Sequence, residues 1–186
     1  PPGRGGAVFS DATSTPSISG CTFFGNLASN SQSNIGAGGG AIYCTNAVVQ
    51  YSAINSNTAN GPGGGVYATG GTLASCTLSG NAATNYGAGG GAFLQNVSTS
   101  SSEFKGNRGI GGGGIYATGG SITGCVITGN LSTGDAGGGV FCYGTTLQQS
   151  TLSGNAAPMG GGLAAAYCPV SATIIWGNCA PQGSEI

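Results

Sequence analysis

The chain has 186 residues, of which 41 are glycine and only seven carry a formal charge, and it has no histidine. Its net charge of −1 and its lack of a basic patch argue against nucleic acid or an anionic membrane surface as a partner, and no apolar run approaches the roughly 20 residues of a spanning helix. Hydrophobic residues make up 39% and recur at fixed places, which excludes disorder, while the clustered glycines exclude collagen.

A unit of about 24 residues repeats along the chain, and an asparagine closes each unit. The closing residues are Asn26, Asn57, Asn81, Asn107, Asn130, Asn155 and Asn178. In chain order, a unit opens with glycines, continues into a pair such as Val66-Tyr67, turns a corner, and then places apolar residues such as Leu73 and Leu78 before the asparagine. The residues between these are mostly polar. This alternation predicts two or three short strands per unit, each with one buried face, and no helix.

Such a unit cannot bury its own apolar face, but a coil stacked on an identical coil about 4.8 Å away can. The repeat therefore predicts an all-β fold, a right-handed parallel β-helix of about seven coils, with residues 1–186 as a single solenoid domain. We expect the closing asparagines to form a ladder of stacked side-chain amides. The alternative is that asparagine is present only for its turn conformation. The glycines are interpreted as corner residues with positive φ.

Two short motifs alternate along the chain. Gly39-Gly40-Ala41-Ile42 has the form GGAI, and both Phe23-Phe24-Gly25-Asn26 and Phe104-Lys105-Gly106-Asn107 have the form FxxN. This pattern covers nearly the whole chain and resembles the repeats of the chlamydial polymorphic outer-membrane proteins, and more broadly right-handed parallel β-helix surface proteins. The resemblance implies a secreted passenger or stalk, extracellular or at the cell surface, that contacts glycans or host and cell-surface proteins if it is adhesive.

The first coil is longer than the others, and its extra residues fall in a polar segment, Leu27 to Ala37. We expect a loop there, either a passive excursion or a binding loop. Neither end of the chain carries a recognisable capping unit, and bare parallel edges invite pairing. The chain is therefore expected to be a fragment of a longer solenoid or the subunit of a filament, with neighbouring repeats or end-to-end copies as its partners.

The seven cysteines fall into three groups. Cys21, Cys76 and Cys125 share one column in every second coil, and Cys44 and Cys142 share another inward column. Residues two coils apart are separated by about 10 Å, beyond disulfide reach, so both groups are interpreted as buried thiols. Cys168 and Cys179 lie outside both columns in the last coil. They are the candidate disulfide, which would fit an oxidising compartment.

No catalytic constellation is found in the sequence. Glycoside hydrolysis requires two carboxylates that flank the scissile bond, whereas the four acidic residues fall in four different coils: Asp11, Glu103, Asp135 and Glu185. A zinc site would require histidine or closely spaced thiols, and the chain has neither histidine nor a C-x-x-C motif. We therefore expect no enzyme activity, no metal and no cofactor.

Binding remains open. An outward column of Phe9, Tyr43, Tyr67, Tyr116 and Phe141, interrupted by Leu94, is a candidate stripe for stacking on sugars or packing against a partner, or its rings pack on one another. Partial ladders of Thr22, Thr77 and Thr151 and of Ser79, Thr128 and Ser153, interrupted by charged and aromatic residues, raise ice binding as a remote alternative. The predicted function is an extracellular structural or adhesive element without catalysis; the alternative is a carbohydrate-binding or polysaccharide-processing β-helix.

Overall fold

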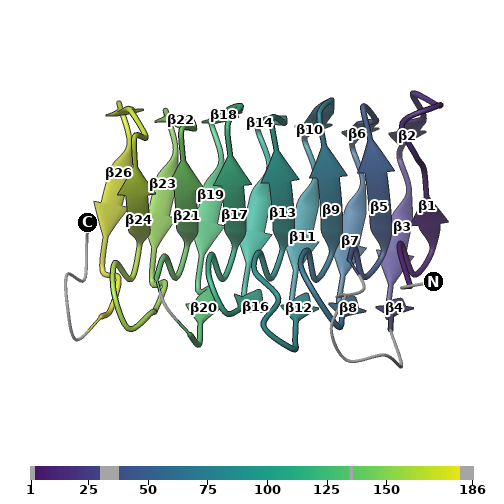
Figure 1. Ribbon diagram of the computed structural model, residues 1–186. Helices are drawn as coiled ribbons and strands as arrows, with labels where there is room; N and C mark the ends of the chain where they lie inside the picture. The colour runs from purple at the N-terminus through teal and green to yellow at the C-terminus, as the bar shows by residue number, and fades with distance from the viewer. Residues whose placement is uncertain (1–2, 30–37, 135, 181–186) are drawn as a thin grey trace.

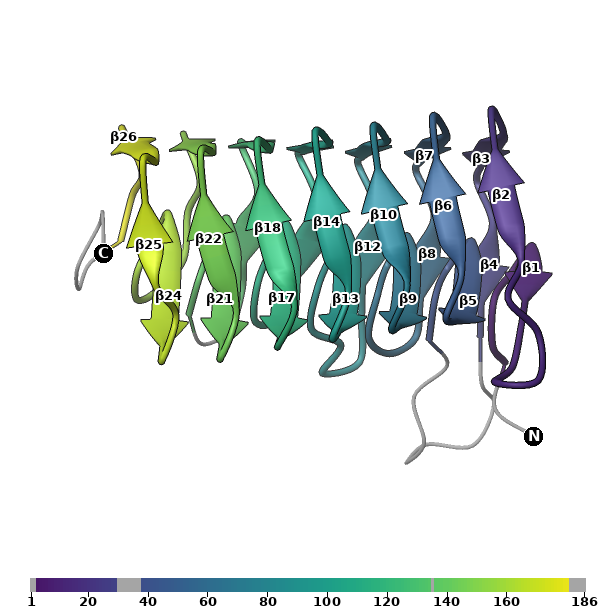
Figure 2. The same cartoon turned by 90° about the horizontal axis from the view of Figure 1, so that it is seen from above.

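The structure is a computed structural model that describes residues 3–29, 38–134 and 136–180. These residues form 26 strands and no helix, and the strands of successive coils lie side by side along a rod (Figures 1 and 2). Within these ranges there is accordingly no helix that could cross a membrane. The predicted all-β parallel β-helix is confirmed.

Four parallel sheets run along the rod, each taking one strand from successive coils. The first sheet contains β1 (Val8–Phe9), β5 (Ile42–Thr45), β9 (Val66–Thr69), β13 (Ala92–Gln95), β17 (Ile115–Thr118), β21 (Val140–Tyr143) and β24 (Leu163–Ala166). The second contains β2 (Ser17–Ser19), β6 (Val48–Gln50), β10 (Thr72–Ala74), β14 (Ser98–Ser100), β18 (Ser121–Thr123), β22 (Thr146–Gln148) and β25 (Val170–Ser171).

The third sheet contains β3 (Thr22–Phe24), β7 (Ala53–Asn55), β11 (Thr77–Ser79), β15 (Glu103–Lys105), β19 (Val126–Thr128), β23 (Thr151–Ser153) and β26 (Ile174–Trp176). The fourth contains β4 (Leu27–Ala28), β8 (Thr58–Ala59), β12 (Ala82–Ala83), β16 (Arg108–Gly109) and β20 (Leu131–Ser132). We call the strands of one coil a rung and number the rungs one to seven. Because the longest sheets have seven strands, the chain makes about six turns between the first and last rungs, slightly fewer than the expected seven coils.

Each apolar side chain of the interior packs on its counterpart in the next rung. Leu78 pairs in register with Ile54 on one side and Phe104 on the other, and all three are fully buried. Leu73 likewise pairs with Val49 in the preceding rung. The core is therefore a set of columns, and each column gains its burial from the coils above and below it.

The fourth sheet was not predicted, because its strands are only two residues long and too short to show alternation. It corrects the start of the expected loop at Leu27 to Ala37. Leu27 and Ala28 form β4, which pairs with β8, and Ala28 is buried. Residues 30–37 of that predicted loop lie outside the described residues.

The glycine runs have two roles, of which the sequence showed one. Gly63 has a φ of +72°, so it takes a left-handed corner as predicted. Its neighbour Gly64 is required for a different reason: a Cβ there would collide with the carbonyl oxygen of Gly90 in the next rung. The glycine side of the rod is thus a place where successive rungs approach too closely for any side chain.

Candidate functional site

The closing asparagines form a continuous ladder. From Asn26 to Asn155, each residue donates its backbone N–H and one side-chain N–H to Oδ1 of the next asparagine, at 2.9–3.0 Å. In the interior, the second side-chain N–H donates to a backbone carbonyl of the preceding rung, as from Asn107 Nδ2 to Leu78 O at 2.9 Å. A buried Asn amide such as that of Asn107 therefore satisfies two donors and accepts two bonds.

Turn conformation does not account for these asparagines. None of the seven has a positive φ, and the left-handed corner falls on the residue before each one, such as Gly80 before Asn81. The same corner is taken by Ser56 before Asn57. The role of asparagine at this column is its hydrogen-bonding side chain, which ties adjacent rungs together.

The outward aromatic column is longer and more regular than predicted. Leu94 was expected to interrupt it, but Phe93 lies opposite Tyr67 and Tyr116, while Leu94 is buried in the core. The expected alignment of this rung is wrong by one residue. Ala92 occupies the inward position that Val or Ile holds in the neighbouring rungs, and its small side chain does not mark it as inward. The column is Phe9, Tyr43, Tyr67, Phe93, Tyr116 and Phe141.

Stacking occupies the faces of these rings. Successive centroids are 4.6–5.5 Å apart and the planes are within 26° of parallel. The guanidinium of Arg4 lies 5.0 Å from the Tyr43 centroid. Burial, followed by the neighbouring Tyr43, raises the pKa of the Tyr67 phenol. A sugar ring needs an open aromatic face, and the inner rings of this column present only their edges.

The predicted disulfide between Cys168 and Cys179 is wrong. Cys168 is bonded instead to Cys142 in the preceding rung, with Cα atoms 6.2 Å apart, and Cys179 is an exposed free thiol. Cys168 lies at the corner between the first and second sheets, in the inward column of Thr145. Cys179 lies beyond the third sheet, bridged to Ala156. Two cysteines of one rung at different corners cannot meet, whereas two in adjacent rungs can.

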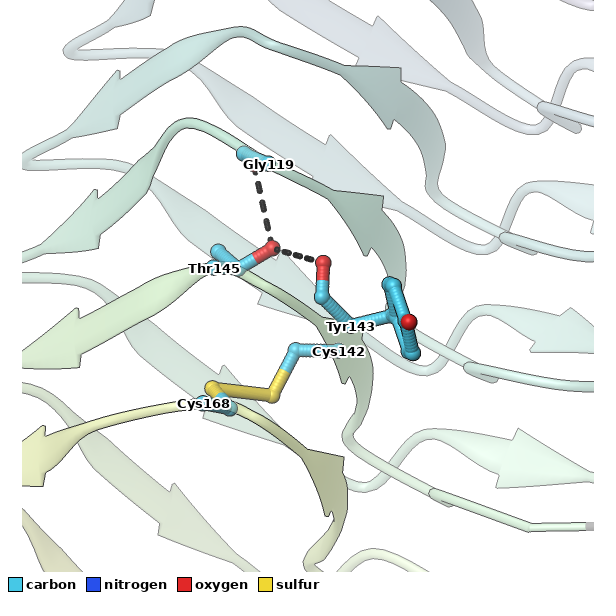
Figure 3. The surroundings of a disulfide bond; sticks show 5 residues. All are labelled: Gly119, Cys142, Tyr143, Thr145 and Cys168. Carbon is cyan, nitrogen blue, oxygen red and sulfur yellow. Dashed lines mark hydrogen bonds between the residues drawn. A yellow bond between two sulfur atoms is a disulfide. The ribbon is translucent and has the colours of Figure 1, made fainter.

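The disulfide joins the sixth and seventh rungs at one corner (Figure 3). Beside it, Thr145 Oγ1 donates to the carbonyl of Gly119 at 3.0 Å and to that of Tyr143 at 3.3 Å. Tyr143 directs its ring away from the disulfide (Figure 3). The disulfide, the hydrogen bonds and the sheets fix the backbone of this corner.

The prediction of a buried thiol at Cys142 is therefore wrong as well, whereas the other predicted thiols are free. Cys44, Cys76 and Cys125 are buried, and Cys21 is partly buried. Burial raises the pKa of Cys44 to about 12 and that of Cys125 to about 11, so both thiols are poorly reactive. In the column of Cys21, Cys76 and Cys125, the rungs between the cysteines carry serine. The backbone N–H of Cys76 donates to Oγ of one of these serines, Ser102, at 3.1 Å.

The charged groups that the structure describes do not assemble into a site. Asp11 is exposed in the first rung, and its hydrogen bonds from the Thr13 hydroxyl and N–H lower its carboxyl pKa. Glu103 lies in β15 of the fourth rung, while Asp135 and Glu185 are outside the described residues. Within the described ranges, no group of three His, Cys, Asp or Glu side chains could hold a metal.

The threonine and serine ladders lie on the outward face of the third sheet. Thr22, Thr77 and Thr151 share a column with Ala53, Glu103, Val126 and Ile174. Ser79, Thr128 and Ser153 share the next column with Phe24, Asn55, Lys105 and Trp176. Charged and apolar residues thus break both columns, which disfavours a regular hydroxyl lattice.

A pair of exposed aromatic rings was missed by the sequence analysis. Tyr143 and Tyr167 meet edge to face, with centroids 5.5 Å apart, at the disulfide corner. The sequence held a signal for this pair, because Tyr143 follows Cys142 and Tyr167 precedes Cys168. Reading it required knowing that these cysteines are bonded to each other.

Comparison with known proteins identifies one repeat. Residues 20–45 match the family model of the Chlamydia polymorphic membrane protein repeat. The matched segment contains Phe23-Phe24-Gly25-Asn26 and Gly39-Gly40-Ala41-Ile42, the motifs on which the resemblance rested. The resemblance to these repeats is confirmed. No curated protein and no solved structure matches the chain.

Proposed function

We propose that this chain is a rigid structural segment of an extracellular, surface-exposed protein, of the passenger or stalk kind, and that it is not an enzyme. The observation that carries the proposal is the asparagine ladder, which runs without a break from Asn26 to Asn178. Each rung is held by its neighbours through the same contacts. A rod of this kind transmits position and load along its axis.

Two findings support a location outside the cell. The matched repeat belongs to a family named for a membrane protein of Chlamydia. The disulfide between Cys142 and Cys168 is of a kind that persists in oxidising compartments. The free thiols at Cys44, Cys76 and Cys125 are compatible with such a compartment because burial protects them.

The separation of the two described carboxylates, Asp11 and Glu103, supports the absence of glycosidase chemistry. Asp11 lies in the first rung and Glu103 in the fourth, roughly 14 Å apart along the rod at about 4.8 Å per rung. Glycosidases hold their two carboxyl groups about 5 to 9.5 Å apart. The aromatic column is also a poor sugar platform, since its ring faces stack on one another.

The partner we propose for the rod is a further β-helical coil, from the same chain or from a second copy. In the seventh rung Val170 is 40% exposed, whereas Leu147 in the same column of the sixth rung is fully buried. A coil that packed on the seventh rung would bury Val170 as the interior rungs bury their counterparts.

Surface labelling tests the location. Antibodies raised against this segment should label intact cells that produce the full-length protein, and a protease added outside should remove the label. Labelling that requires permeabilised cells would refute the surface assignment. Turnover of a polysaccharide by the purified protein, abolished by Glu103→Gln, would refute the absence of catalysis.

A further inference from the structure

Tyr167 stands in a backbone conformation that its residue type disfavours. Its φ is +53°, in the left-handed region. The equivalent corner of the five preceding rungs is always Asn or Gly: Asn46, Gly70, Asn96, Gly119 and Gly144. A bulky side chain is strained there, while Gly is not and Asn is tolerated. The seventh rung thus departs from the rule that the other rungs follow.

Packing does not explain this departure. Tyr167 is 82% exposed, so the free energy gained from burying its side chain is too small to offset the backbone strain. A strained and largely exposed residue at a corner where every preceding rung from the second to the sixth has Asn or Gly is a reason to look for function.

A second exposed ring stands beside the first. Tyr143 is 53% exposed, and the two ring planes meet at 83°. In the column of Tyr143 the preceding rungs carry polar residues: Thr45, Thr69, Gln95 and Thr118. Both rings therefore stand at positions where the preceding rungs carry no aromatic residue. Together they form an exposed edge-to-face pair.

The backbone that carries both rings is held rigidly. Cys142 precedes Tyr143, Cys168 follows Tyr167, and the two cysteines are bonded to each other. Figure 3 shows the Tyr143 ring on the far side of its strand from the disulfide. Fixing two rings before binding lowers the entropic cost of contacting a ligand.

We propose that Tyr143 and Tyr167 form a binding site for a neutral carbohydrate. Residues 109–134 and 136–180 contain no charged side chain, so the described part of the last three rungs offers no complement to an anionic or cationic partner. Two rings at a convex corner also fall short of the roughly 800 Å² per partner that a stable protein interface buries. A sugar ring, with an apolar C–H face and a rim of hydroxyls, matches a tyrosine, which combines an aromatic face with a phenol.

Sugar binding at this corner is independent of the proposed structural role, because it requires only the two tyrosines and not a particular function of the rod. The test is isothermal titration of the purified protein with cellohexaose and with chitohexaose, and with an anionic heparin hexasaccharide for comparison. Binding of a neutral hexasaccharide with a Kd on the order of 1 mM or tighter is expected, with at least a roughly tenfold loss in both Tyr167→Gly and Tyr143→Thr.

Tyr51→Gly is the matched control. Tyr51 also has a left-handed φ, of +51°, and is 67% exposed, but it lies at the corner between the second and third sheets. At that corner other rungs also take a left-handed φ with residues that are neither Asn nor Gly, namely Ser75, Ser101, Gln149 and Ala172, so Tyr51 is no exception there. Its replacement should leave the affinity unchanged. The urea midpoint of Tyr167→Gly should equal or exceed that of the wild type, since glycine relieves the strain.

Three results would overturn the site. The first is a wild-type protein that binds neither neutral hexasaccharide at millimolar concentration, or binds only heparin. The second is a Tyr167→Gly protein that binds as tightly as the wild type. The third is a lower unfolding midpoint for Tyr167→Gly, which would make the ring structural. None of these results bears on surface exposure of the segment, which labelling tests separately.

Discussion

The fourth and seventh rungs contain the same columns but bury them differently. In the fourth rung Phe104, which shares a column with Ile175, is fully buried, and Thr99, which shares a column with Val170, is buried as well. In the seventh, Val170 is 40% exposed and Ile175 is only partly buried. The seventh-rung residues are no less apolar than their fourth-rung counterparts, and what differs is that the fourth rung packs between two described rungs while the seventh packs on one. Burial in this fold is thus a property of neighbours as much as of the residue.

The seventh rung also carries what the fourth lacks, a covalent link to the rung beside it. Its single packed side gives less hydrophobic stabilisation, and the disulfide between Cys142 and Cys168 ties it at one corner. Interior rungs are held by packing and by the asparagine ladder. The comparison predicts that equivalent changes will cost most in the middle of the rod.

The largest effect is expected from truncating the central phenylalanine. Phe104→Ala should lower the free energy of unfolding by about 3–5 kcal/mol, because Phe104 is fully buried and the cavity lies between two rungs. Phe23→Ala is the control, since Phe23 occupies the same column in the first rung but is only partly buried. It should lose clearly less. Equal losses in urea denaturation would contradict the dependence of burial on neighbours.

The ladder gives a second interior test. Asn107→Ala removes the acceptor of the Asn81 N–H and side-chain amide, and the donor to Leu78 O and Asn130 Oδ1. Several buried polar groups lose a partner, so we expect a loss of about 3 kcal/mol in urea denaturation.

Asn26→Ala is the matched variant at the first rung, where the residue is not fully buried and donates two bonds to Asn57. It should lose about 1 kcal/mol. If Asn107→Ala were as mild as this, the interior ladder would not be a major source of stability.

Much of this architecture was predictable from the sequence, and the two failures have separate causes. The columns of Leu78 and Asn81 were predictable because a stacked repeat places like on like. The aromatic column was placed one residue off at Phe93, because Ala92 is too small to be recognised as inward. The repeat suggests a bond between Cys168 and Cys179 because both lie outside the two inward columns in the last coil, whereas Cys168 is bonded to Cys142, 26 positions earlier. Contacts between corners of adjacent rungs do not follow from periodicity alone.

Removing the disulfide sharpens the contrast at the end of the rod. In a Cys142→Ala, Cys168→Ala double variant, the seventh rung should open more readily by about 2 kcal/mol, which corresponds to roughly thirtyfold faster hydrogen exchange. The Ile174 amide, which donates to Ser150 O, should report this change. The Glu103 amide, which donates to Cys76 O in the interior, should exchange as before. Uniform acceleration along the chain would show that the disulfide stabilises the whole rod.

The smallest effect is expected from a buried hydroxyl group that has no hydrogen-bond partner. Thr99 is the polar member of an otherwise apolar column and is 1% exposed, and its hydroxyl has no hydrogen-bond partner. Val has nearly the same shape and no polar atom, so Thr99→Val should raise the free energy of unfolding by about 1 kcal/mol. Thr72→Val, on the same sheet but partly exposed, should change it by less than about 0.5 kcal/mol. Destabilisation by Thr99→Val in urea would mean that the hydroxyl finds a partner in solution, and that the interior columns tolerate polar groups by hydrating them.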